Sequence, residues 1–192
     1  MRVFITETFS RPSAAGSASA PSGLREAAVL LPLFERPAGV TLLLAQRALH
    51  LHHHPGQISL PGGMIEATDS GPLAAALRET HEEVGISPDR VEVIGEMGTI
   101  DTRTGFRITP IVGFVAPDVT FVLDSFEVEY VFEVPLSFLL DAHNYRRQSR
   151  TLEGMGEISY YALDYDGQNI WGATAQILVN FAQRLGVVGI PD

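Results

Sequence analysis

Residues Gly56–Ile86 read GQISLPGGMIEATDSGPLAAALRETHEEVGI, and this stretch decides the fold. Its second half predicts a single helix. Ser70 offers a side-chain oxygen as an N-cap, and Pro72 suits a first turn, where a missing N–H costs little. The alanines and leucine that follow have high helix propensity, and Gly85 is typical of the residue that ends a helix.

Two faces of this predicted helix differ in character. Four residues fall on one apolar stripe at about 100° per residue: Leu73, Leu77, Thr80 and Val84. Three carboxylates, Glu79, Glu82 and Glu83, fall within an arc of roughly 100° on the other side. Such a face is often only a solvated surface, but converging carboxylates also form a site for a hard cation that prefers oxygen ligands. The pattern therefore favours bound Mg²⁺ or Mn²⁺.

The residues around the acidic face strengthen the metal-site interpretation. Gly62 and Gly63 form an amide-rich turn before the helix, where backbone groups can approach a metal or a phosphate. Arg78 lies beside Glu79 and one turn before Glu82. It can therefore orient carboxylates as well as bind anions.

These residues resemble the Nudix box, G-x5-E-x7-R-E-U-x-E-E-x-G-U, in which U is a bulky apolar residue. The matching positions are Gly63, Asp69 and the run from Arg78 to Ile86. Asp69 stands where the general box has Glu, and eight residues rather than seven separate it from Arg78. Thr80 is a weak version of an apolar position. The resemblance implies a metal-dependent hydrolase in which Arg78 and Glu79 are catalytic and Glu79, Glu82 and Glu83 bind metal.

The longer spacing resembles one branch of the family, the coenzyme A pyrophosphatases. That branch has an upstream pattern, roughly L-L-T-x-R-S-x-x-L-R-x-H-x-G-x-x-x-F-P-G-G, and residues 43–63 of this chain follow its spacing throughout. Ala48, His52 and Leu60 replace the branch's Ser, Arg and Phe. The resemblance implies that the substrate is bound by Arg47, His52, Gln57, Gly62 and Gly63.

Composition excludes several kinds of chemistry. The chain has 192 residues, no cysteine, and 13 cationic residues that are all arginine, so thiolate, lysine Schiff-base and P-loop lysine chemistry are excluded. The formal net charge of −10 disfavours nonspecific binding to nucleic acid or to a membrane. A polyanionic substrate would be received by metal ions and a few arginines.

The chain reads as one domain, residues 24–192, preceded by a flexible leader, residues 1–23, rich in Ser, Ala, Gly and Pro. Its first residues do not form a signal peptide, and no apolar run approaches 18 residues, so we expect a cytoplasmic protein. An organellar transit peptide is the minor alternative. A small-molecule substrate is the expected partner, and a homodimer is left open.

Apolar β-rich runs and turns predict the rest of the fold. Two runs joined by a turn at Arg36–Gly39 predict a hairpin, and a helix is expected over Gly172–Leu185. The two runs of the hairpin are Ala27–Phe34 and Val40–Arg47. Further extended segments are expected at Ile58–Leu60, Val91–Thr99, Arg107–Val115, Val119–Leu123, Glu129–Val134 and Met155–Leu163, with one helical turn at Pro135–Leu140. A mixed sheet with these helices indicates an α/β fold, and the resemblance implies the Nudix α/β/α sandwich.

Other polar groups have more than one interpretation. The residues His50–His54 could form a zinc site, a solvated loop or an anion contact. The anion contact rests on His52, which stands where the coenzyme A branch has arginine. Arg103 and Arg107 are candidate phosphate contacts. Nudix enzymes often use a late-loop Glu, which implies that Glu127 or Glu129 helps catalysis, and we assign Glu129.

The resemblance therefore implies a metal-dependent pyrophosphohydrolase that cleaves coenzyme A or acyl-coenzyme A to 3′,5′-ADP and (acyl-)4′-phosphopantetheine. One alternative keeps the chemistry and changes the substrate to ADP-ribose, a dinucleotide or an oxidised nucleotide. A second alternative is a ligand-sensing module without turnover. The full set Glu79, Glu82 and Glu83 argues against the sensor, because a sensor needs no cluster that activates water.

Overall fold

The computed structural model describes residues 1–10, 23–152 and 156–191. A mixed sheet forms the centre of the molecule, with strands ordered β3-β2-β1-β7-β5, β4 also pairing with β1, β6 with β7 and β8 with β2. The strands are β1 (Arg25–Arg36), β2 (Gly39–Arg47), β3 (Ile58–Ser59), β4 (Gly62–Met64), β5 (Val91–Glu96), β6 (Ile100–Asp101), β7 (Phe106–Val115) and β8 (Val128–Pro135). A smaller sheet has the order β11-β10-β9 and comprises β9 (Arg146–Leu152), β10 (Gly156–Tyr165) and β11 (Gln168–Trp171).

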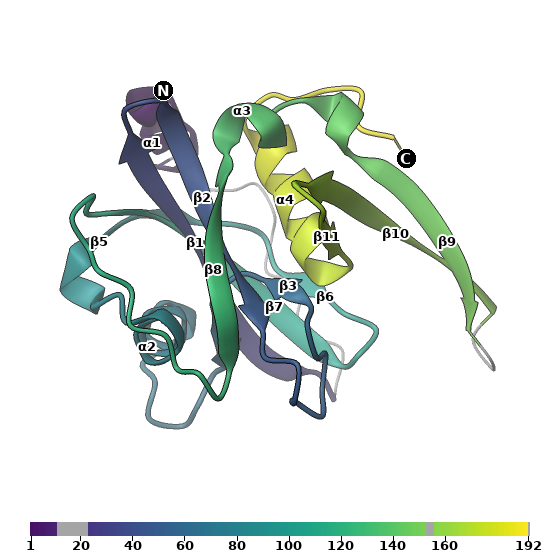
Figure 1. Cartoon of the computed structure of the whole chain (residues 1–192), viewed down its shortest axis with the longest axis horizontal. Coiled ribbons are helices and arrows are strands. Elements are labelled where there is room, and N and C mark those ends of the chain that lie inside the picture. Colours follow the sequence, from purple (N-terminus) through teal and green to yellow (C-terminus); the bar gives the residue numbers. More distant parts are fainter. Residues whose placement is uncertain (11–22, 153–155, 192) are drawn as a thin grey trace.

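Helices cover both faces of the main sheet (Figure 1). They are α1 (Arg2–Ser10), α2 (Pro72–Val84), α3 (Leu136–Leu139) and α4 (Ala173–Arg184), with short 3₁₀ turns η1 (Pro88–Arg90) and η2 (Ala142–Asn144). Strand β1 is buried on both sides because successive side chains alternate. Leu31 and Leu33 join the core that contains α1 and α4, whereas Ala28 and Leu30 pack with α2. The predicted α/β/α sandwich with a mixed sheet is confirmed.

The first residues of the chain form a helix instead of part of a flexible leader. In α1, Ile5 and Phe9 lie one turn apart and are buried, and the Phe9 ring stacks on Phe181 of α4 with centroids 5.5 Å apart. Burial of two large side chains stabilises a short helix that propensity alone would leave marginal. The rest of the predicted leader, residues 11–22, lies outside the described residues.

The structure confirms most of the predicted strands and corrects the pattern elsewhere; the short strands β4, β6 and β11 were not predicted. The hairpin of β1 and β2 turns at Arg36–Gly39, as expected. The segment Val119–Leu123, expected to be extended, forms no strand; its backbone bonds instead to the end of α2, through Val122 N–H and the Val84 carbonyl. Strand β9 was not predicted, because its polar residues show no apolar alternation.

Among the described residues, no helix is long and apolar enough to span a membrane.

The site depends on how β4 and α2 pack against β1. Strand β4 is antiparallel to β1, with Gly63 opposite Ala28 and Gly62 opposite Val29. A Cβ atom at Gly62 would run into the β1 backbone, and its φ of 146° also favours glycine. Gly62 therefore lets the chain approach β1 closely, and the pairing of both glycines with β1 positions the turn before α2.

Candidate active site

Helix α2 presents the acidic residues, and its ends differ slightly from the prediction. Gly71 rather than Ser70 is the N-cap, with no side-chain hydrogen bond, and Pro72 occupies the first turn. Gly85 ends the helix as expected, with φ 76°, and its N–H donates to the His81 carbonyl at 3.0 Å.

The buried face of α2 is wider than the predicted apolar stripe and includes different residues. It consists of Ala75, Ala76, Thr80, Glu83 and Val84, while Leu73 is exposed. Thr80 is compatible with this burial because its hydroxyl donates to the Ala76 carbonyl at 2.6 Å. Glu83 therefore lies on the buried face of α2, whereas the apolar pattern placed leucine on that face.

Glu83 is the most enclosed acidic group of the site. It is 4% exposed, and its Oε2 accepts a 3.0 Å hydrogen bond from the Gly62 N–H. Arg47 Nη1 lies 3.9 Å from Oε1. Burial raises the pKa of Glu83 to about 8, and the neighbouring carboxylates of Glu127 and Glu79 push the pKa in the same direction. The positive charge around Glu83 is therefore too small to offset the effect of burial on its carboxylate.

Glu79 lies against the glycine turn. An added Cβ at Gly63 would come within 2.5 Å of Glu79 Cδ, so the absence of a side chain at 63 makes room for this carboxylate. Burial raises the pKa of Glu79, while the hydrogen bond from Arg78 opposes that rise. Glu79 and Glu83 thus converge on the two-glycine turn from successive turns of α2.

Arg78 connects the remaining acidic groups. Its Nε and Nη2 bind Asp69 at 3.1 and 3.0 Å, and Nη1 binds Glu79 at 2.9 Å and Glu82 at 3.0 Å. Nη2 also donates to the Met64 carbonyl at 3.1 Å. The fork of a guanidinium suits this task, because several acceptors can be held in one plane. Arg78 is therefore placed to orient the carboxylates, as predicted from its position.

Asp69 shows how the longer spacing before Arg78 is accommodated. Its Oδ2 accepts from the Glu66 N–H at 2.8 Å, and its own N–H donates to the Glu66 carbonyl at 3.0 Å, which closes a tight turn. Hydrogen bonding from Arg78 holds the pKa of Asp69 below its usual range. The shorter acid thus still pairs with the arginine through two guanidinium nitrogens, Nε and Nη2.

The loop between β7 and β8 brings a further carboxylate to the site. Asp124 N–H donates to the Glu83 carbonyl at 3.0 Å, and Ala48 N–H donates to the Glu127 carbonyl at 2.8 Å. Glu127 is consequently close enough to raise the pKa values of Glu79 and Glu83. The side chain of Glu129, the residue assigned from the sequence, is exposed on β8. The structure brings Glu127, rather than Glu129, to the acidic cluster.

Asp124 is a residue that the sequence analysis missed. Its backbone ties the loop to α2, and its carboxylate accepts from the Phe126 N–H at 2.9 Å. The available signal was an Asp at the start of a short polar turn, a position where side chains commonly bond to the backbone two residues on.

Arg47 borders the same cluster from the end of β2. Its Nε is buried and, within the described residues, has no hydrogen-bond partner, while its guanidinium lies beside Glu83. A buried donor without a partner costs about 1–3 kcal/mol. An anion, such as a phosphate oxygen, would be a suitable acceptor for this donor, and the substrate contact expected of Arg47 stays a prediction.

The other candidate residues have different positions. Gln57 is partly buried and contributes its carbonyl to Arg47 N–H at 2.9 Å, whereas His52 is exposed in the loop after β2. Arg107 binds Asp101 at 2.7 and 2.8 Å, which already engages its guanidinium. The predicted zinc alternative at His50–His54 gains no support, since no group of three metal-ligating side chains is found among the described residues.

The acidic side chains nevertheless fit a hard divalent cation. In the present arrangement Arg78 binds Glu79 and Glu82, so these carboxylates are turned to the guanidinium rather than to one common point. Glu79 and Glu83 have raised pKa values, and Glu127 adds a third negative group. An oxygen-rich cluster with excess negative charge is the donor set that Mg²⁺ and Mn²⁺ prefer.

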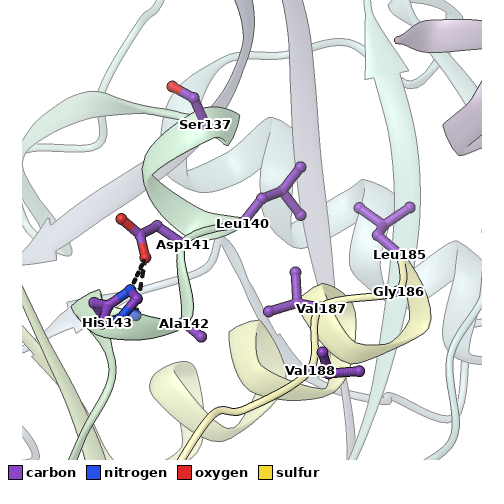
Figure 2. Close-up of a pocket in the computed structure, with 9 residues that line it drawn as sticks. All are labelled: Ser137, Leu140, Asp141, Ala142, His143, Leu185, Gly186, Val187 and Val188. Carbon is purple, nitrogen blue, oxygen red and sulfur yellow. Dashed lines mark hydrogen bonds and ion pairs between the residues drawn. The ribbon is translucent and has the colours of Figure 1, made fainter.

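A separate hollow of about 460 Å³ lies between α3, η2 and the segment after α4 (Figure 2). Its rim carries an Asp141–His143 pair, with Nδ1 2.8 Å from Oδ1, and its walls include Leu140 and Val187. None of the predicted site residues lines this hollow. The acidic cluster of α2 is therefore the candidate active site.

Comparisons with known proteins agree with this geometry. A family model described as NUDIX domain matches residues 24–148. The Nudix hydrolase NudL of Salmonella paratyphi B is 42% identical over 163 residues, which cover 85% of this chain and 84% of NudL. The NudL of Salmonella newport gives the same values.

Solved structures show the same fold. The Nudix hydrolase RenU from M. smegmatis aligns with a TM-score of 0.51 and 23% identity, over 65% of this chain and 78% of RenU. A MutT/nudix family protein from Enterococcus faecalis aligns with a TM-score of 0.52 and 14% identity, over 98% of this chain and 80% of that protein. With the carboxylates of α2, the glycine turn and Arg78 in the arrangement described above, this chain belongs to the Nudix hydrolase family.

Proposed function

We propose that this chain hydrolyses the diphosphate of coenzyme A or of an acyl-coenzyme A, giving 3′,5′-ADP and (acyl-)4′-phosphopantetheine. One observation carries the proposal. The stretch that resembles the coenzyme A branch begins at Leu43 and ends at Gly63, and two of its residues contact Glu83: Arg47 through Nη1 at 3.9 Å and Gly62 through its N–H at 3.0 Å. The residues that distinguish the branch thus adjoin the acid at the centre of the site.

Binding of the diphosphate would rely on Arg47 and the glycine turn. Arg47 Nε is a buried donor with no partner in the described part of the chain, and a phosphate oxygen is a suitable acceptor. Gln57 shapes this wall through its carbonyl bond to the Arg47 backbone. The Gly62 N–H bonds to Glu83 and Gly63 lies against Glu79, so the glycine turn borders both carboxylates.

Glu79, Glu82 and Glu83 would hold Mg²⁺ or Mn²⁺. When bound, the metal neutralises the diphosphate, acidifies a water molecule and stabilises the departing phosphate. Arg78 would hold Glu79 and Glu82 in position. Glu127, beside Glu79 and Glu83, is better placed than Glu129 to orient the attacking water and accept its proton. Substitution at phosphorus needs such positioning more than a covalent nucleophile.

A panel of substrates tests this proposal against its alternatives. Coenzyme A, octanoyl-coenzyme A, ADP-ribose, diadenosine tetraphosphate and 8-oxo-dGTP would each be incubated with Mg²⁺, with Mn²⁺ and with EDTA. We expect the highest kcat/KM with coenzyme A or its acyl form, and none with EDTA. A preference for another compound by tenfold or more would replace the substrate, and binding without turnover of any compound would favour the sensor.

A matched pair of arginine variants tests the role of Arg47. Arg47→Gln should raise the KM for coenzyme A by about tenfold or more, because a charge-assisted bond to phosphate is lost. Arg146→Gln removes an equal charge from an exposed position of β9 and should leave KM unchanged. Equal effects of both variants would mean that Arg47 acts only through the overall charge of the protein.

A further inference from the structure

Two large apolar side chains and a histidine ring lie exposed next to the active site. Leu49 is 67% exposed and Phe126 is 66% exposed. The rings of His50 and Phe126 have centroids 5.0 Å apart and an interplanar angle of 60°. These three residues come from loops separated by more than 70 positions in the sequence, so the fold gathers them. We call Leu49, His50 and Phe126 the rim platform.

Hydrogen bonds hold both loops of the rim platform in place. The Phe126 N–H donates to Asp124 Oδ1 at 2.9 Å, which fixes the turn that carries the ring. The Ala48 N–H donates to the Glu127 carbonyl at 2.8 Å and joins the two loops directly beside Leu49 and Phe126. Leu49 also packs against Gly56, where an added Cβ would lie 2.9 Å from its Cδ2. The apolar groups are therefore presented to solvent on an ordered backbone.

The rim platform is continuous with the acidic cluster. Phe126 directly precedes Glu127, whose carboxylate is close enough to Glu79 and Glu83 to raise their pKa values. Asp124, which fixes the Phe126 backbone, is itself bonded to the Glu83 carbonyl. His50 lies three residues after Arg47 on the other loop. A substrate whose diphosphate lies over Glu83 and Arg47 thus has the rim platform within the length of an attached group.

We propose that the rim platform stacks the nucleobase of the substrate and so selects nucleotide over non-nucleotide diphosphates. This inference deepens the proposed function and rests on it only in requiring a substrate that carries a base. The tilted pair of His50 and Phe126 offers an aromatic face to a flat ring, and Leu49 extends the apolar area. Base stacking on an exposed aromatic ring tolerates any base, because every base has a π face.

The order of the rim platform favours a rigid occupant. Groups already fixed before binding lose little conformational freedom when a ligand arrives. A planar base can cover the exposed Phe126 ring in one placement, whereas an acyl or pantetheine arm would lose many torsions to cover the same area. An apolar chain on the rim platform is the competing occupant, and the test includes it.

The test compares two non-hydrolysable ligands that differ only in the base. Calorimetry with Mg²⁺ would measure the Kd of α,β-methylene-ADP and of ribose 5-methylenediphosphonate for wild type and variants, with 4′-phosphopantetheine as a third ligand for the competing apolar arm. Phe126→Ala should weaken binding of the adenine compound about tenfold and change binding of the base-free compound less than twofold. Phe126→Trp should keep the affinity for the adenine compound. Phe4→Ala, which removes another exposed phenylalanine from α1, is the matched control and should change neither Kd.

Three results would overturn the inference. They are an unchanged Kd of the adenine compound in Phe126→Ala, a parallel loss for both ligands, or a loss of 4′-phosphopantetheine affinity without a loss for adenine, which would assign the rim platform to the apolar arm. Melting temperatures of the variants identify a misfolded protein, and Leu49→Ser then serves as the second variant. Because these are binding measurements, they remain informative if the substrate panel shows no turnover of coenzyme A.

Discussion

The backbone N–H of Asp124 donates to the carbonyl oxygen of Glu83 at 3.0 Å, so the loop that carries Glu127 is fastened to the helix that carries the buried acid. A single residue of α2 thereby contributes its carbonyl to the scaffold and its carboxylate to the site. The position of Glu127 is set by the backbone, and its side chain can be changed without loosening this attachment.

The first prediction uses this independence. Glu127→Gln should lower kcat by about 10²-fold, in the range expected for loss of a general base, with little change in melting temperature. Glu129→Gln, in the same segment but with an exposed side chain, is the matched control and should retain near wild-type kcat. Steady-state kinetics at saturating Mg²⁺ decides between them. A large loss in Glu129→Gln alone would restore the assignment made from the sequence.

The second prediction concerns Glu83 and pH. The pKa of Glu83 is raised from 4.5 to about 8 by burial, so in the absence of metal its stabilising effect is full below pH 4.5 and is lost as pH rises toward 8. Glu83→Gln removes this loss of stability at high pH, because glutamine does not ionise, and its side-chain oxygen can still accept from the Gly62 N–H. In EDTA, its melting temperature should match wild type near pH 5 and exceed it near pH 9, while turnover with Mg²⁺ falls almost completely.

Glu82→Gln is the control for this experiment, because it removes an exposed carboxylate from the same helix. Its melting temperature in EDTA should follow that of wild type at both pH values. The assignment of Glu83 would fail if Glu83→Gln kept the wild-type rate at limiting as well as saturating Mg²⁺.

The third prediction concerns space at the glycine turn. Gly63→Ala would place a Cβ 2.5 Å from Glu79 Cδ, so the carboxylate must move away. We expect kcat to fall at least tenfold and the Mg²⁺ concentration for half-maximal rate to rise, because a metal ligand is displaced. Combining Gly63→Ala with Glu79→Asp, which shortens the acid, should recover part of the metal affinity. Additive losses in the double variant would show that the clash is not the cause.

The fourth prediction concerns His52, which stands where the coenzyme A branch has arginine. At pH 8 an imidazole is largely neutral, whereas a guanidinium keeps its charge. His52→Arg should therefore raise kcat/KM for coenzyme A several-fold at pH 8 and leave the value for 3′-dephospho-coenzyme A unchanged. His53→Arg adds the same charge one residue away and serves as the control. A gain with both substrates would mean that His52 does not read the 3′-phosphate.

The fold was largely predictable because its elements have strong local signals. Pro72 and Gly85 mark the two ends of α2, and the apolar runs of β1, β2 and β7 are long enough to identify buried strands. The helix start was misplaced by one residue, because Ser70 has the right chemistry for an N-cap but Gly71 occupies the position. Strand β9 escaped notice because pairing with β10, rather than its own composition, makes it a strand.

The candidate site was predictable where residues lie close in sequence and less so where loops meet in space. The acids of α2 and Arg78 follow from helical spacing. The choice between Glu127 and Glu129 depends on hydrogen bonds from Ala48 and Asp124, which join segments that no local pattern connects. The burial of Glu83 was likewise missed, because hydrophobic periodicity assigns the inner face of a helix to leucine before carboxylate.

The turn at Asp69 has a consequence for how this site can change over generations. A longer approach to the helix and a shorter acid compensate for each other, since both guanidinium bonds of Arg78 are made with one more residue in the chain and one fewer methylene in the side chain. Either change alone would leave the arginine badly matched, and the carboxylates that it steadies would drift. Loop length and acid identity are therefore coupled through Arg78, and a change in one favours a compensating change in the other.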